Sequence, residues 1–128
     1  MFLSLTAVSV RYPRSSSARP AVDRVTLSLA AGQIGVLIGP SGCGKTSLLR
    51  AVAGLEPLAE GTLRMGERTL SDAARHIQVP PEERRIGMVF QDYALFPHLS
   101  IADNVAFGIH RQPRAQREAR VADLLDPV

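Results

Sequence analysis

GPSGCGKTSLL, at residues 39–49, fits the phosphate-binding pattern G-x-x-x-x-G-K-[ST] at each of its fixed positions. The short apolar run IGVLI at 34–38 precedes it and has the composition of a fully buried central strand. Residues 46–53 follow with leucine and valine at helical spacing, and Gly54 is placed to end that helix. This order of strand, glycine-rich loop and helix predicts an α/β fold with a phosphate-binding loop.

The residue types of the loop suit a polyphosphate ligand. Glycines at 42 and 44 allow the backbone angles that let successive N–H groups point inward at phosphate oxygens. The helix that begins near Gly44 adds its positive end beneath them. Lys45 supplies a mobile cation for the β- and γ-phosphates, and the Thr46 hydroxyl can ligate the Mg²⁺ that bridges them. We therefore predict that ATP and Mg²⁺ bind at nine consecutive residues: Gly39, Pro40, Ser41, Gly42, Cys43, Gly44, Lys45, Thr46 and Ser47.

Charge and cysteine content narrow the class of protein. The 128 residues carry a net charge of +3, and Lys45 is the only lysine. Because the arginines are spread along the chain and aromatic residues make up only 5%, we expect a solvated basic surface and no nucleic-acid partner. The single Cys43 forms no internal disulfide, which suits a reducing cytoplasm, and its side chain is expected to face away from the ligand.

No segment indicates membrane insertion or secretion. No window approaches the roughly 18 uninterrupted apolar residues of a membrane span. The start, MFLSLTAVSVRYP, lacks a basic region and favours a strand over a signal peptide.

Apolar spacing, glycine and proline predict the other elements. A strand is expected at 3–12 and a half-buried strand at 22–30, and TLRM at 62–65 is expected in a small hairpin within 56–70. Residues 71–85 are polar, contain a double proline, and are expected to be mostly loop.

The last third of the chain predicts one strand and two helices. IGMVF at 86–90 is a second candidate for a buried strand. Ser100 is a plausible N-cap for a short helix through Val105, and 113–128 has proline at the start of an amphipathic helix. We find no internal repeat and no clear linker, so 1–128 is interpreted as part of one domain.

Two long runs resemble a known family. LIGPSGCGKTSLLRAVAGLEPLAEGTL at 37–63, followed by PPEERRIGMVFQDYALFPHLSIADNVAFGI at 80–109, is similar to the ATP-binding subunits of ABC importers. The similarity covers essentially the whole chain and is greatest to the group that imports ferric iron, sulfate, thiamine or polyamines. It implies an ABC-type P-loop ATPase core with an N-terminal antiparallel β subdomain, and ferric iron or a similar small solute as the cargo.

The resemblance implies roles for two residues outside the loop. Gln91 matches the family's Q-loop glutamine, which reaches Mg²⁺ and the attacking water, and its amide ligates a metal without adding charge. The alternative is an ordinary polar residue at a strand end. Tyr12 matches the aromatic residue that stacks on adenine, a role that its π-face suits. The alternative is a surface tyrosine at a strand end.

A third segment resembles the family's contact with its membrane subunits. Near the groove that receives a coupling helix of the permease lie five residues: Tyr93, Leu95, Phe96, Pro97 and His98. The alternative is local core packing. His98 is not interpreted as a metal or catalytic residue, because no Cys/His cluster accompanies it. The resemblance further implies a second ATP-binding subunit, an indirect solute-binding protein, and peripheral attachment at the cytoplasmic face of the inner membrane.

Other family motifs are not found in this sequence. We find no apolar strand ending in Asp-Glu, no LSGGQ-type signature and no switch histidine, and Asp92 follows Gln91 rather than a strand. We therefore interpret 1–128 as the N-terminal half of such a domain, truncated before the signature motif and the Walker B strand. The runs at 34–38 and 86–90 would then be short of strand partners, so we expect a marginal fold.

The alternatives belong to different functional classes. A truncated module could bind nucleotide without hydrolysing it, and hydrolysis by this chain alone is not expected. A small kinase would need a lid with arginines and an acceptor site. A GTPase would need an N-K-x-D base reader, which a chain whose only lysine is Lys45 cannot contain. An ABC-type ATPase of DNA repair or translation is a further alternative, but FQDYALFPHLS at 90–100 favours transport.

Overall fold

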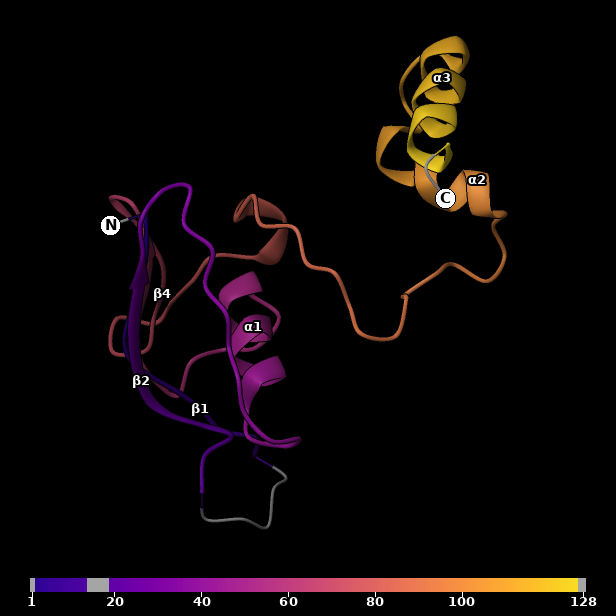
Figure 1. The fold of residues 1–128 in the computed structure, drawn as a ribbon. Coiled ribbons are helices and arrows are strands. Elements are labelled where there is room, and N and C mark those ends of the chain that lie inside the picture. Colours follow the sequence, from indigo (N-terminus) through magenta and orange to yellow (C-terminus); the bar gives the residue numbers. More distant parts are fainter. Residues whose placement is uncertain (1, 14–18, 127–128) are drawn as a thin grey trace. The chain divides into compact units, whose positions relative to one another are not determined.

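The computed structural model describes residues 2–13 and 19–126 (Figure 1). These residues fall into two compact units, within Met1–Met88 and Val89–Val128. The first unit holds a β-sheet and the helix that follows the phosphate-binding loop, and the second holds helices (Figure 1). No helix within these described ranges has the length and apolar character needed to cross a bilayer.

The described part of the first unit forms a five-stranded antiparallel sheet in the order β2-β1-β3-β4-β5. The strands are β1 Leu3–Val10, β2 Val22–Leu29, β3 Glu60–Met65, β4 Arg68–Asp72 and β5 Ile77–Gln78. These bounds confirm both predicted N-terminal strands and the predicted hairpin, which turns between Met65 and Arg68. The stretch 71–85 also contains the end of β4, the short β5 and the 3₁₀ helix η1, Pro81–Glu83, where the sequence predicted mostly loop.

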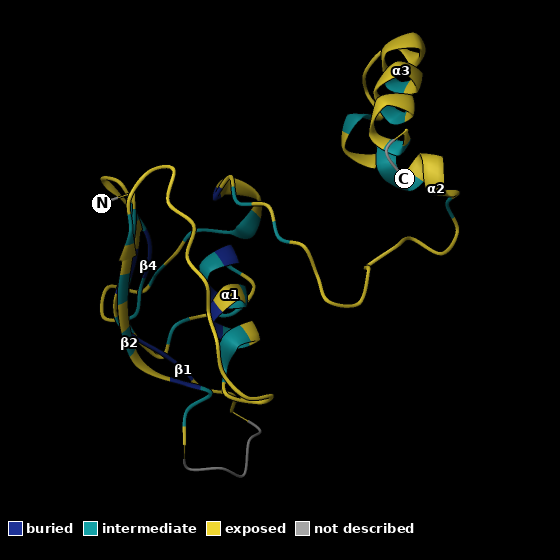
Figure 2. Ribbon diagram, in the orientation of Figure 1, coloured by how far each residue is buried: buried dark blue, intermediate teal, exposed yellow. Residues whose placement is uncertain are grey.

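Helix α1, Lys45–Ala53, packs one side against this sheet and completes the core. Figure 2 shows the buried residues gathered mainly on the strands and on one side of α1. The core residues come from β1, β2, α1, β3 and β4: Leu5, Val8, Val10, Val22, Leu48, Ala51, Leu63 and Leu70. The helix ends as predicted, because Gly54 takes a left-handed φ of 86° at its C-cap.

Neither apolar run that the sequence predicts as a buried strand forms one. Residues 34–38 and 86–90 have no strand assignment. Ile34 and Ile38 are 89% and 92% exposed, and Val89 is 98% exposed. The prediction was wrong for the described structure because such a run becomes a central strand only when strands pair with both of its edges. Within the described residues, none pairs with either run.

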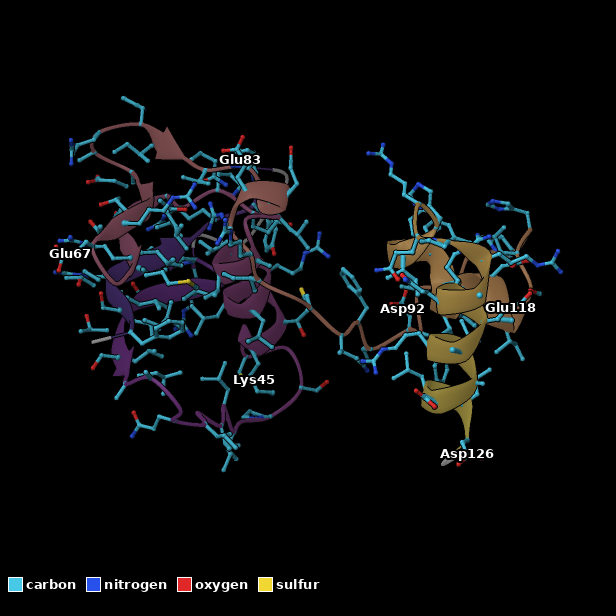
Figure 3. All side chains as sticks on the ribbon, turned by 90° about the horizontal axis from the view of Figure 1, so that it is seen from above. Lys45, Glu67, Glu83, Asp92, Glu118 and Asp126 are labelled. Carbon is cyan, nitrogen blue, oxygen red and sulfur yellow. The ribbon has the colours of Figure 1, made fainter. Side chains whose placement is uncertain are left out.

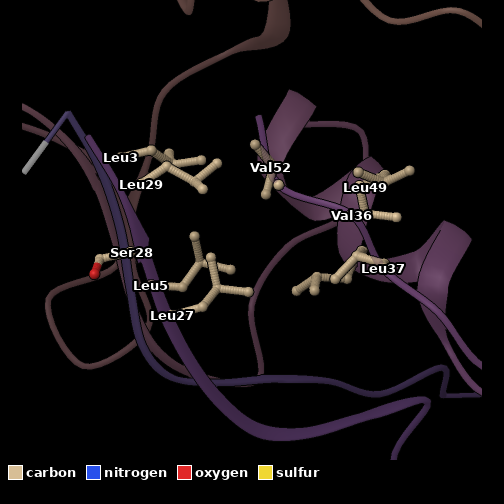
Figure 4. Close-up of a pocket in the computed structure, with 11 residues that line it drawn as sticks. Leu3, Leu5, Leu27, Ser28, Leu29, Val36, Leu37, Leu49 and Val52 are labelled. Carbon is tan, nitrogen blue, oxygen red and sulfur yellow. The ribbon is translucent and has the colours of Figure 1, made fainter. Parts of the chain in front are cut away.

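An apolar cavity of about 280 Å³ lies between β1 and β2 on one side and α1 with residues 35–37 on the other (Figure 4). Leu5 and Leu27 point into it from the sheet, and Val36 and Leu37 line it on the opposite side. The cavity is open to solvent, so apolar side chains of this part of the first unit are left partly exposed. The marginal fold stays a prediction.

A buried arginine joins α1 to the outer strands of the sheet. Arg84 is 1% exposed, although it lies in the stretch predicted as loop. Its guanidinium donates five hydrogen bonds: Nε to the Val79 carbonyl (2.7 Å), Nη1 to the carbonyls of Ala51 (3.1 Å) and Val52 (3.2 Å), and Nη2 to the Leu70 carbonyl (3.2 Å) and Ser71 Oγ (2.8 Å). These acceptors are neutral, so the arginine satisfies backbone oxygens rather than a carboxylate.

The position of Arg84 at the carboxyl end of α1 has an electrostatic advantage. A cation there meets the negative end of the helix dipole, which offsets part of the cost of burial. That cost remains, because desolvation, followed by repulsion from Arg68, lowers the pKa of Arg84 from its ordinary value. The fit also explains the residue that ends the helix, since a Cβ on Gly54 would collide with the guanidinium.

The second unit contains α2 Ile101–Ala106, the 3₁₀ helix η2 Phe107–Ile109, and α3 Arg114–Leu125. Ser100 Oγ accepts a hydrogen bond from the Asp103 amide at 3.1 Å, which confirms the predicted N-cap. Pro113 is the N-cap of α3, as the sequence predicted for the start of the last helix. None of the described residues of α2 and α3 is fully buried.

We expect Arg84→Met to lower the free energy of unfolding by about 2–4 kcal/mol, because it leaves buried carbonyl oxygens without donors. The measurement is urea unfolding of the 128-residue chain followed by circular dichroism. Arg75→Met, at an exposed arginine, is the matched control and is expected to change little. Equal losses for the two variants would contradict the role of Arg84.

Candidate functional site

The amino-terminal end of α1 is open to an anion. Gly44 is the N-cap with a left-handed φ of 97°, and no side chain caps the helix. The first turn holds no acidic residue. The helix dipole and the first-turn N–H groups are therefore available to a negatively charged ligand. Gly42 also takes a left-handed φ, of 79°, so both glycines that the sequence singled out adopt angles that disfavour other residues.

The phosphate-binding loop packs closely against the residue that precedes β2. A Cβ on Gly44 would collide with the carbonyl oxygen of Ala21 and lie 3.5 Å from a methyl group of Val22. The amide of Ala21 donates to the Val10 carbonyl at 2.8 Å, which ties this contact to the end of β1. The loop is thus held against the sheet at its last glycine.

Lys45 folds back over the loop. Its Nζ donates to the carbonyl oxygens of Gly39 at 2.6 Å and Pro40 at 2.8 Å. Figure 3 shows Lys45 at the end of α1 that adjoins the loop. Lys45 is one of the residues that line an open cavity of about 430 Å³. The Lys45 ammonium is therefore held at the loop by two backbone carbonyl oxygens.

Cys43 does not face away from Lys45. Its Sγ lies 3.4 Å from Lys45 Nζ, and a Cβ on Gly39 would come within 2.7 Å of the same sulfur. Cys43 thus lies beside the lysine ammonium, and the expectation that its side chain faces away from the ligand stays a prediction. The side chain of Cys43 remains exposed to solvent.

Two of the predicted binding residues meet at the start of α1. The Tyr12 hydroxyl and Ser47 Oγ are hydrogen-bonded at 2.8 Å. Tyr12 follows the end of β1 and its side chain is partly exposed, whereas Ser47 lies in the first turn of α1. Thr46 is exposed beside it. The structure thus brings Tyr12 to the phosphate-binding loop, and its stacking on adenine stays a prediction.

Gln91 lies in an exposed turn of the second unit and does not belong to the unit that holds Lys45. Just after it, Tyr93 and Ala94 take left-handed φ angles of 51° and 54°, which cost energy for residues with a Cβ. Its reach to Mg²⁺ stays a prediction. Groups of three or more His, Cys, Asp or Glu side chains able to hold a metal are absent from the described ranges.

The segment that resembles the permease contact is held by one asparagine. Asn104 Oδ1 accepts from the Phe96 amide at 2.9 Å, and its Nδ2 donates to the Ser100 carbonyl at 2.9 Å. The ring of Phe96 packs against Phe107 with centroids 4.5 Å apart. Local packing therefore accounts for part of this segment.

Other apolar side chains of that segment are not packed. Tyr93 and Leu95 are 89% and 64% exposed. Pro97 and His98 are also exposed, and the His98 ring lies 6.0 Å from that of Phe96. The described surface of the second unit thus presents an aromatic and aliphatic patch to solvent.

The ABC transporter family matches residues 22–128 of the chain. The spermidine/putrescine import ATP-binding protein of Pseudomonas fluorescens is 46% identical over 82% of the chain and 27% of its own length. The Fe(3+) ions import ATP-binding protein of Streptomyces avermitilis is 44% identical over 100% of the chain and 35% of its own length. The chain thus spans about a third of these relatives.

A solved structure supports the same relationship. A dimeric ATP-binding cassette in a post-hydrolysis state, bound to ADP and Pi, matches with a TM-score of 0.79 and 26% identity. The match covers 97% of this chain and 56% of that one.

We expect Lys45→Ala to weaken ATP binding by about 10- to 100-fold, because it removes a charge-assisted hydrogen-bond donor to the phosphates. Isothermal titration of the 128-residue chain measures the loss, and circular dichroism verifies that the variant is folded. Arg75→Ala removes one exposed cation from the same unit and is expected to leave the affinity unchanged. An unchanged affinity in Lys45→Ala would disprove the phosphate assignment.

Proposed function

The chain belongs to the ABC transporter family, and from that premise we propose that it is the ATP-binding part of a subunit that energises an ABC importer. The observation that carries this proposal is the start of α1. There an uncapped helix terminus, two left-handed glycines and the Lys45 ammonium converge on one loop. That arrangement suits the terminal phosphates of ATP better than any uncharged ligand.

We assign the roles at the phosphates to three residues. Lys45 neutralises the β- and γ-phosphates, and Thr46 supplies a hydroxyl to Mg²⁺. Gln91 supplies an amide oxygen to the metal and orients water for hydrolysis. When bound, Mg²⁺ draws negative charge from the phosphates and so favours attack by water. The role of Gln91, which lies in the second unit, rests on the resemblance of its flanking sequence to the family.

The partners follow from the same family. We propose that two copies of the ATP-binding subunit act as a dimer, and the dimeric state of the related cassette supports this. The exposed Tyr93 and Leu95, beside Phe96, Pro97 and His98, form the contact with the permease. Apolar side chains on a loop braced by Asn104 are suited to receive one face of a helix. The subunit would then lie at the cytoplasmic face of the inner membrane, with a solute-binding protein acting through the permease.

The imported solute is proposed to be ferric iron or a similar small solute. The ferric-iron relative aligns over the whole chain. The polyamine relative, at a similar identity, aligns over less of it. The residues of the ATP site do not select the solute, because that choice belongs to the partner proteins.

A nucleotide-binding module without hydrolysis is the alternative function. The features that hold phosphate lie in the described first unit, whereas the sequence contains no LSGGQ-type signature and no strand ending in Asp-Glu. Coding DNA downstream of codon 128 separates the two functions. A signature motif and an Asp-Glu strand there, in any frame, would favour the ATPase.

We expect the 128-residue chain to bind ATP and to release phosphate at a rate near the background of buffer alone. The physical reason is that binding needs the loop, whereas hydrolysis also needs groups that this sequence does not contain. Titration calorimetry measures binding, and a coupled phosphate assay measures turnover. Robust turnover that Lys45→Ala abolishes would contradict this division.

The choice of solute is tested by uptake. Cells that lack the gene are expected to lose most energy-dependent uptake of labelled ferric iron and to keep uptake of labelled spermidine. Return of ferric-iron uptake with a plasmid copy of the complete gene is the control. Loss of spermidine uptake alone would assign the importer to polyamines instead.

A further inference from the structure

A side-chain hydrogen bond links Tyr12, which is predicted to stack on adenine, with α1, the helix that follows the phosphate-binding loop. Tyr12 OH and Ser47 Oγ lie 2.8 Å apart, although the residues are 35 positions apart in the sequence. We propose that Ser47 is a positioning residue for Tyr12, and that this bond sets the preference of the site for a nucleoside triphosphate over a bare polyphosphate. The inference rests on the proposed function and assigns it a residue that determines specificity.

The Tyr12 side chain is held at both of its ends. At its backbone end, Tyr12 comes two residues after the end of β1. The last residue of β1, Val10, accepts a hydrogen bond from the Ala21 amide, which holds the strand end in place. At its outer end, the hydroxyl is fixed by Ser47. A tyrosine ring has two side-chain torsions, and these two attachments restrict both of them.

The ring nevertheless remains accessible. Tyr12 is 38% exposed, so part of its surface is free to contact a flat ring such as a purine. Orienting that ring before the ligand arrives lowers the conformational entropy lost on binding. A bare polyphosphate has no base and gains nothing from the orientation. The effect of the hydrogen bond should therefore appear in the ratio of the two affinities.

The position of Ser47 fixes where the ring stands relative to the phosphates. Ser47 lies in the first turn of α1, two residues after Lys45 and next to Thr46. The contact between Gly44 and Ala21 is a second point at which the loop and the segment before β2 are packed together. Tyr12 is consequently held at one distance from the phosphate-binding groups, as a ligand with a base and a phosphate chain requires.

A direct contact between Ser47 and a phosphate is the competing explanation. In that case Ser47→Ala would weaken ATP and tripolyphosphate by the same factor and leave their ratio unchanged. Tyr12→Phe keeps the ring and removes only the hydroxyl, so it alters the tether without touching the phosphate side. The pair of variants therefore separates positioning from direct binding.

The test measures the dissociation constants of ATP and inorganic tripolyphosphate for the 128-residue chain by titration calorimetry. We expect Tyr12→Phe and Ser47→Ala each to lower the preference for ATP by about fivefold, the usual effect of one hydrogen bond. The double variant is expected to lose about the same factor as each single one, because both changes remove one shared interaction. Ser47→Thr keeps a hydroxyl and is expected to retain most of the preference.

Failure of the positioning role and failure of the proposed function give different results. Ser28→Ala, at an exposed serine of β2, is expected to leave the ratio unchanged. An unchanged ratio in Tyr12→Phe, or losses that multiply in the double variant, would overturn the positioning role while leaving ATP binding intact. A wild-type chain that binds neither ATP nor tripolyphosphate would instead refute the proposed function itself.

Discussion

The buried guanidinium of Arg84 is the constraint on which the arrangement of the first unit depends. It donates to the last carbonyls of α1 and to β4, two elements that also contribute apolar side chains to the core. A guanidinium carries five N–H donors in a rigid plane, so these bonds fix orientation as well as distance. The carboxyl end of α1 is thereby set against the sheet.

The opposite end of α1 is fixed in a different way. Gly44 allows the loop to approach Ala21, and Gly54 allows Arg84 to reach the last turn. Both glycines take left-handed φ angles, and a Cβ on either one would collide with a neighbouring group. The helix therefore begins after one such glycine and ends before another. Both ends of the helix are therefore packed against other parts of the first unit. At the amino-terminal end, no side chain caps the N–H groups of the first turn.

Local chemistry was predictable from the sequence, and long-range pairing was not. The glycines and Lys45 of the loop, the end of α1 at Gly54 and the cap at Ser100 all depend on neighbouring residues, and each appears where the sequence indicates. The hydrogen bonds of Arg84 join residues up to 33 positions apart, and arginine in a polar stretch with a double proline gives no signal of burial. The runs at 34–38 and 86–90 failed for a related reason, since their strand character depends on partners elsewhere.

The same distinction separates the residues proposed to bind phosphate from the residue proposed to act in hydrolysis. The groups that would hold phosphate all lie on one short segment of the first unit, where Gly42 and Gly44 permit the left-handed backbone angles that the loop adopts. Tyr12 joins that segment through one side-chain hydrogen bond, whereas Gln91 lies in the other unit, in a turn followed by two strained residues. The preorganised part of the proposed site is therefore the phosphate-binding loop with Tyr12, because contacts within one unit position both.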